Sequence, residues 1–271
     1  MNLRNPLTKC AIALTTLLSM SNYSNAQFRL PGIIQRYQMG YSYPMAWAEY
    51  KRTDRITAAD GSKFDSTVTS KTHSRFSFGG LVGTTIPVKR LGAKSMFAIS
   101  IDMLYNGYLW DYRAPMFSGF DFNDNGEITG YRYSSDYYFD GMTVHMAMPV
   151  GGDFKFGCDA LADKSIRFCG TVGAGAYPSM SATVDASDAG FGFGINPYAK
   201  AEFGIMAGIC FKIRAMYTFG NIPFYTEGNS ISSLAGLDSK SSLTGKQSFS
   251  LSLIFMPFSW NWKESGWWNS Y

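Results

Sequence analysis

The feature that most constrains this chain is a strict alternation of apolar and polar residues. In residues 209–220 (ICFKIRAMYTFG), every second side chain is apolar, whereas the positions between them include Lys212, Arg214 and Thr218. Successive side chains of a strand point to opposite faces, so this period of two predicts a β-strand with one apolar face and one charged face.

The same alternation returns along most of the chain. It predicts strands over residues 74–88, 96–110, 138–150, 166–177, 191–205, 209–220 and 248–258, with a weaker eighth over 42–52. Several of these exceed five or six residues and suit a tilted membrane-crossing strand of about 9–11 residues. Long and short polar connections alternate between them. The fold class we predict is therefore all-β, an antiparallel up-and-down transmembrane β-barrel of about eight strands.

Two observations favour a membrane barrel over a soluble one, which alternation alone cannot do. Opposite charges share the polar face, as Lys200 and Glu202 do, and aromatic residues gather near strand ends. Composition indicates an all-β chain. Aromatic residues make up 16% of the chain and charged residues only 16%, against about 25% charged in an average soluble domain. In a membrane barrel the nearly charge-free face meets lipid and the charged face lines the interior. Only a closed barrel suits strands in lipid, because an open edge would leave backbone groups unpaired.

The polar face predicts what fills the barrel. Eight strands enclose a space just wide enough to be filled by side chains, so we predict a closed interior. The residues expected in an interior polar network are Arg75, Asp102, His145, Arg167, Lys200, Glu202, Lys212 and Arg214. The aromatic residues near strand ends expected at the membrane interfaces are Trp47, Tyr108, Trp110, Tyr137, Trp260 and Trp262.

The ends of the chain predict its compartment. Arg4 and Lys9 precede a short apolar stretch, residues 11–20, and small residues precede Gln27. This pattern predicts a secretory signal peptide over residues 1–26. We divide the remainder into an N-terminal extension (27–41), the barrel (42–260) and a Trp-rich periplasmic tail (261–271), and we expect the protein in the outer membrane.

Three cysteines follow the predicted cleavage site: Cys158, Cys169 and Cys210. An odd number excludes a fully paired disulfide framework. Cys158 and Cys169 flank a short polar stretch, so a hairpin disulfide and simple packing of small residues both remain open. Without a CxxC motif or histidine partners, we predict no metal site among them, and no cofactor elsewhere.

Residues 121–128 (DFNDNGEI) look like the first half of a calcium-binding EF-hand loop. However, Arg132 stands where the motif needs a bidentate glutamate, and strands rather than helices are predicted on both sides. Asn125 and Gly126 both accept a positive φ and favour a tight turn. We predict a surface hairpin tip.

The chain resembles the PorT-like outer-membrane β-barrel domain family of Gram-negative bacteria over about residues 40–260. The resemblance rests on residues 74–88 (SRFSFGGLVGTTIPV), Met148-Pro149-Val150, residues 170–177 (GTVGAGAY) and the alternating final strand from Phe249 to Leu253. One departure is that the chain continues past its last strand to Tyr271. The resemblance implies insertion by the barrel-assembly machinery, but no single biochemical activity.

Three classes of function compete. A small-solute channel conflicts with the predicted filled interior. A barrel-embedded lipid-modifying enzyme would need a base, and only His73 and His145 are histidines, without a GxSxG or HExxH motif. A net charge of +4 without a basic cluster argues against nucleic acid. We therefore predict no enzymatic activity, and an integral outer-membrane barrel with a structural or accessory role. Its expected partners are outer-membrane lipids and an envelope or secretion-associated protein complex that binds surface loops, such as residues 221–245 with Phe224 and Tyr225.

Overall fold

The computed structural model describes residues 30–57, 61–113, 116–126, 128–134, 138–184, 189–229 and 238–262. The predicted signal peptide, Tyr137 and the tail beyond Trp262 lie outside these residues. The described residues form three short helical elements: α2 (Leu30–Gln35), α3 (Cys158–Leu161) and the 3-10 helix η2 (Pro257–Asn261). None of the helices in the described part of the chain is long and apolar enough to cross a bilayer.

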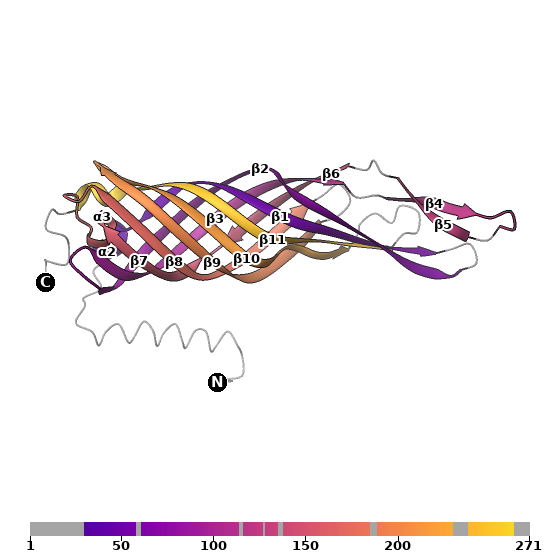
Figure 1. Ribbon diagram of the computed structural model, residues 1–271, viewed down its shortest axis with the longest axis horizontal. Helices are drawn as coiled ribbons and strands as arrows, with labels where there is room; N and C mark the ends of the chain where they lie inside the picture. Colours follow the sequence, from indigo (N-terminus) through magenta and orange to yellow (C-terminus); the bar gives the residue numbers. More distant parts are fainter. Residues whose placement is uncertain are drawn as a thin grey trace, which may run out of the picture.

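Nearly all remaining described residues are in antiparallel strands (Figure 1). The strands are β1 (Gln38–Thr57), β2 (Lys63–Arg90), β3 (Ser95–Arg113), β4 (Met116–Phe122), β5 (Ile128–Ser134), β6 (Tyr138–Ala147), β7 (Val150–Gly157), β8 (Phe168–Val184), β9 (Ala189–Ala207), β10 (Ile209–Asn229) and β11 (Asp238–Met256).

The main sheet closes on itself as a barrel. β1 pairs with both β2 and β11, which joins the first and last strands. β6 and β7 lie end to end between β3 and β8 and together occupy one strand position of the barrel. The break between them falls at Pro149, which lacks a backbone N–H for the ladder. With β6 and β7 counted as one strand, the described residues form an eight-stranded barrel. The predicted fold class is confirmed.

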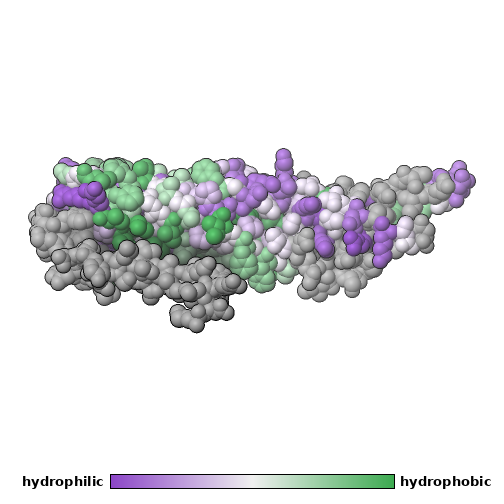
Figure 2. All heavy atoms as spheres, turned by 90° about the horizontal axis from the view of Figure 1, so that it is seen from below, coloured by the Kyte–Doolittle hydropathy of each residue, from purple (hydrophilic) through white to green (hydrophobic). Residues whose placement is uncertain are grey.

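The outer face of the ring is apolar. Figure 2 shows hydrophobic residues gathered over the barrel, with hydrophilic ones at one end and along the projecting hairpins. Exposed large apolar side chains on the membrane-crossing parts include Phe97, Ile99, Met103, Leu109, Val144, Phe154, Val172, Phe193, Ile195, Phe203, Ile213, Leu251 and Leu253. An apolar exterior around a charged interior is the arrangement of an outer-membrane β-barrel protein.

The two ends of the barrel differ. At the short-turn end lie α2, α3 and the tight turn at Gly208, whereas at the hairpin end β1 and β2 and the separate β4–β5 sheet project beyond the ring (Figure 1). β1 begins at Gln38, before the predicted start at residue 42, and the β1–β2 pairing continues to Thr57 opposite Lys63. Residues 53–57 and 63–65, which lie in the polar connection after the predicted strand over 42–52, are therefore strand.

The hairpin interpretation of residues 121–128 is confirmed. Asp121 and Phe122 end β4, residues 123–126 form the turn, and Ile128 begins β5; Gly126 has a φ of 80°. The Gly126 N–H donates to the Asn123 carbonyl (2.9 Å). Asp121 forms an ion pair with Arg132, so the cation that breaks the calcium motif binds its first carboxylate.

The apolar exterior generates a prediction. Leu251→Lys, on the outer face of β11, should lower the free energy of unfolding by about 2–4 kcal/mol, because the new ammonium group faces hydrocarbon. Val88→Lys, beside Lys89 and Arg90 near the short-turn end, should cost about 0–1 kcal/mol. Urea unfolding in phospholipid vesicles measures both, and equal costs would contradict the assignment of this face to lipid.

Candidate functional site

The barrel interior is filled by side chains in successive layers. Beginning at the short-turn end, apolar groups around Cys158 and Met96 come first. The charged layer follows and consists of Arg36, Asp102, Asp153, Lys155, Asp159, Lys200, Glu202, Lys212 and Arg214. An apolar cluster around Leu104, Tyr198 and Met216 lies above it, and an aromatic layer around Tyr108, Trp110 and Phe224 lies nearest the hairpin end.

The strand period places the charges of this layer. Lys200 and Glu202 on β9, and Lys212 and Arg214 on β10, are each two residues apart and therefore share the inner face. Asp102 reaches them from β3, on the other side of the ring. All five side chains are buried. A buried charge is tolerated only when it is paired and hydrogen-bonded, so these groups must meet in the lumen.

Arg214 joins two carboxylates across the interior. Its Nη1 lies 2.8 Å from Asp102 Oδ2, and its Nε donates to Glu202 Oε1 at 2.7 Å. Gln38 at the start of β1 donates to Asp102 Oδ1 at 2.7 Å. Lys200 extends the network, with Nζ 3.1 Å from Asp153 Oδ2 and donating to Ser100 Oγ at 2.7 Å. Strands from around the ring are therefore linked through its centre.

Asp159 of α3 connects the charged layer to the short-turn end. Its Oδ2 lies 2.7 Å from Lys155 Nζ and 2.6 Å from Lys212 Nζ, and Oδ1 lies 3.5 Å from Arg36 Nη1. Burial itself disfavours the ionised carboxylate, but Lys155, Lys212 and Arg36 outweigh burial and hold the pKa of Asp159 well below its usual range. The α3 turn is thus fastened inside the end of the barrel.

Glycines make room for two of these carboxylates. Gly83 pairs with Asp102 across β2 and β3, and Gly173 pairs with Asp153 across β7 and β8. A Cβ at either glycine would collide with the facing carboxylate oxygen. Each aspartate can lie over the neighbouring strand because that strand has no side chain there.

The aromatic layer corrects two predicted interface residues. Tyr108 and Trp110 share the inner face of β3 with Asp102, whereas Tyr105 and Leu109 point outward. The two rings stack at 5.6 Å, and Trp110 Nε1 donates to Thr143 Oγ1 at 2.8 Å. Their place near a strand end suggested an interface, whereas their phase within the strand decides which way they point.

His145 lies within the same layer. Its Nδ1 is 2.7 Å from Ser181 Oγ, its Nε2 is 3.2 Å from Tyr177 Oη, and its ring stacks on Tyr177. It is a packed and hydrogen-bonded interior residue. Phe224 and Tyr225, expected as loop contacts, are also buried inside the barrel.

Two predicted members of the interior network do not belong to it. Arg75 is exposed because a register shift between Ser74 and Phe76 inserts an extra residue at this point and turns the side chain outward. Arg167 is exposed because it lies in the turn before β8, beyond the end of the lumen. The other six predicted residues, Asp102, His145, Lys200, Glu202, Lys212 and Arg214, are buried inside.

Of the remaining residues predicted at the membrane interfaces, two are exposed and one is buried. Trp47 and Trp260 have exposed side chains, at 41% and 63%. Trp262, in contrast, is buried and donates from Nε1 to the Gln35 carbonyl at 3.0 Å. It therefore packs under the short-turn end with α2, and does not face an interface.

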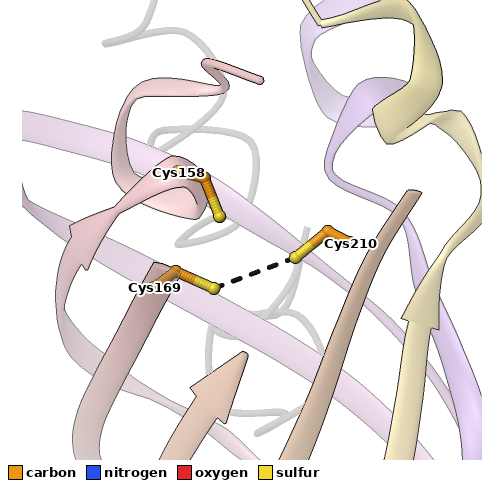
Figure 3. Close-up of side chains that lie close together, drawn as sticks. All are labelled: Cys158, Cys169 and Cys210. Atoms are coloured by element: carbon orange, nitrogen blue, oxygen red, sulfur yellow. Dashed lines mark hydrogen bonds between the residues drawn. The ribbon is translucent and has the colours of Figure 1, made fainter. Parts of the chain in front are cut away.

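The three cysteines converge at the short-turn end (Figure 3). They come from α3, β8 and β10, all are buried, and all are free thiols. Their sulfurs lie within 4.8 Å of one another, with Cys169 Sγ 3.8 Å from Cys210 Sγ. The structure therefore has no disulfide between Cys158 and Cys169. We call these three residues the cysteine cluster; they are the described side chains that can hold a metal ion.

This cluster was not predicted from the sequence because Cys210 is distant from the other two cysteines along the chain. Cys169 pairs with Gly204 of β9, and Gly204 in turn pairs with Lys212, two residues from Cys210. A Cβ at Gly204 would come within 2.8 Å of Cys169 Sγ. Side chains of β8 and β10 thus meet across β9 because Gly204 leaves the space open. The one signal for the cluster was the alignment of β8, β9 and β10, and that alignment is known only once the strand register is known.

Comparisons with known proteins give no close relative. No family model and no curated protein matches the chain. Among solved structures, the outer membrane protease OmpT from Escherichia coli has 7% identity and a TM-score of 0.40, covering 82% of this chain and 96% of its own. The attachment invasion locus protein Ail of Yersinia pestis, solved with a heparin analogue, has 10% identity and a TM-score of 0.27, covering 81% and 99%. These values are too low to transfer either protein's activity to this chain.

One prediction is corrected by this comparison. Sequence analysis predicted no enzymatic activity, but one of these two similar structures is a protease. The exclusion of enzymes from the functions open to this barrel is therefore withdrawn.

The charged layer generates a prediction of stability. Asp102→Asn keeps the shape of the side chain but leaves Arg214 and Lys200 without a full counter-charge, so it should lower the free energy of unfolding by about 3–5 kcal/mol. Asp65→Asn, the same change in the exposed ion pair with Arg55, should have little effect. Urea unfolding in vesicles compares them, and similar losses would show that burial of the network is not what stabilises the barrel.

Proposed function

We propose that this outer-membrane barrel is closed to solutes and has a structural or accessory role in the cell envelope, in which its projecting hairpins bind a partner. The observation that carries the proposal is the filled interior. Apolar, charged and aromatic layers follow one another along the lumen, and the charged layer links β1, β3, β7, β9 and β10. The barrel then serves as a rigid scaffold.

The charged layer also weakens the alternative of a small-solute channel. A channel needs polar groups that line the wall and leave water between them. Here the charges on opposite walls contact one another directly, and the groups in these contacts are nearly inaccessible to solvent. Opening a path would separate buried ion pairs, which is strongly unfavourable.

The hairpins supply the surface for binding. β4 and β5 form their own two-stranded sheet beyond the barrel (Figure 1). Phe120 and Phe122 lie 6.1 Å apart on β4, and Phe122 is 58% exposed. Phe120 is half-buried, whereas the exposed ring of Phe122 lies on a strand outside the barrel, and exposed aromatic residues are enriched at binding surfaces. This supports a protein partner for the hairpin.

We also propose that the chain is related to the PorT-like barrels and that it has the following partners. The apolar exterior suits outer-membrane lipids, and insertion would use the barrel-assembly machinery that such barrels require. An envelope or secretion-associated complex is the partner class that fits a barrel with extended hairpins and a closed lumen.

The proposal is tested by photo-crosslinking in cells. A crosslinking amino acid at position 122, replacing Phe122, should give a discrete covalent adduct with another envelope protein, because this side chain projects from the hairpin. The same amino acid at position 193, replacing Phe193 on the outer face of β9, is the control and should give no comparable protein adduct, since lipid surrounds it.

A deletion separates binding from folding. Replacing residues 116–134 with a short Gly-Ser turn should abolish the complex but leave heat-modifiable migration on a gel unchanged, because β4–β5 is a separate sheet. Absence of any adduct at position 122, together with a normal cellular phenotype of the deletion, would refute the accessory role.

A further inference from the structure

We infer that the cysteine cluster is a binding site for one soft, thiol-seeking d10 metal ion, Zn²⁺ or Cu⁺, at the short-turn end of the barrel. No metal was predicted for these residues from the sequence. The inference rests on three independent observations: the spacing of the sulfurs, the chemistry of the surrounding groups and the way the fold delivers the three thiols to one point.

The spacing fits a metal better than a disulfide. A disulfide requires sulfurs about 2.05 Å apart, whereas Cys169 Sγ and Cys210 Sγ are 3.8 Å apart. Thiolates bound to zinc at about 2.3 Å in tetrahedral geometry lie about 3.8 Å from one another. Cys158 Sγ is also within 4.8 Å of both others. Small shifts of the three side chains would therefore place all the sulfurs around one ion.

The surroundings are rich in sulfur and shielded from water. Cys210 is flanked in register by Met206 on β9 and Met256 on β11. Met256 and Trp262 are buried against the cluster, and Met206 packs beside it. Thiolate and thioether ligands select Cu⁺ and Zn²⁺ over harder ions such as Mg²⁺ or Ca²⁺. The site is thus chemically specific for soft metals.

The charged layer offers a counter-charge. Zn²⁺ held by three thiolates carries one net negative charge, which a nearby cation stabilises. Lys212 runs beside the cluster, since its Cγ and Cys169 Sγ would both lie 2.8 Å from a Cβ at Gly204. Asp163, which follows α3, instead accepts hydrogen bonds from Ser165 and is outside the ion pairs.

The fold holds the three thiols without needing the metal. Cys158 begins α3, which Asp159 ties to Lys155 and Lys212. Cys210 is fixed through its backbone N–H, which donates to Ser259 Oγ of η2 at 2.7 Å. A site whose ligands are already gathered loses little conformational entropy when the ion binds, which favours affinity.

The test uses the full-length mature protein, folded in detergent, stripped of metal by a chelator and kept reduced. Zn²⁺, and separately Cu⁺ under anaerobic conditions, is titrated against a competing chromophoric chelator. We expect one ion per chain. Cys169→Ser should weaken binding more than about 100-fold, because losing even an outer partner of a metal ligand costs about 10–100-fold. Met180→Leu, a sulfur-removing change on the lipid face, is the matched control and should not alter affinity.

A second measurement does not depend on variants that must fold. X-ray absorption of the loaded parent protein should show three sulfur ligands at about 2.3 Å if the ion is zinc. Metal analysis of protein extracted from its native outer membrane then distinguishes zinc from copper. The inference would be overturned by absence of binding with all three thiols free, by equal affinity in a variant lacking all three cysteines, or by native protein carrying a disulfide within the cluster.

Discussion

The whole structure depends on one constraint: hydrocarbon offers no partner for a backbone N–H or C=O, so a strand that crosses a membrane must be paired on both edges. The pairing of β1 with β11 removes the last open edge. Once the ring is closed, each strand has one face toward lipid and one toward the lumen, and the period-two pattern of the sequence is its direct consequence. Pro149 is tolerated because it falls at a break between two ladder segments.

Closure as an eight-stranded barrel in turn determines how wide the lumen is. So narrow a lumen must be filled by side chains, and the side chains that fill it are often charged. Their burial is tolerable because each has an opposite charge within reach, as Arg214 has in both Asp102 and Glu202. Glycines opposite the carboxylates provide the necessary space. With the lumen filled, the interactions proposed for this protein fall at the projecting hairpins and at the short-turn end.

Sequence periodicity was sufficient for the fold and for most of the interior. The charges on β9 and β10 were predicted inside because their phase is uninterrupted, and the structure places them there. Arg75 was misplaced because a bulge reverses the phase locally, and nothing in the sequence marks that bulge. Tyr108 and Trp110 were assigned to an interface by residue type and by their place near a strand end, although the phase of β3 already placed them inside.

The cysteine cluster could not be predicted for a different reason. Its members come from three elements, and they meet only because β8, β9 and β10 are aligned with Gly204 between them. Register is set by contacts that are distant in sequence, so it emerges from the folded ring. The same holds for Asp159 and Arg36, which are not on strands and carry no alternation, yet complete the charged layer.

The central claim is that paired charges and packed rings close the lumen, and single-channel recording in planar lipid bilayers tests it most directly. The account predicts that the purified, heat-modifiable barrel inserts without discrete conductance steps over a wide range of voltage. Reproducible steps from the intact protein, of a size that follows salt concentration, would contradict it, because they would require a continuous water path past Arg214 and Asp102.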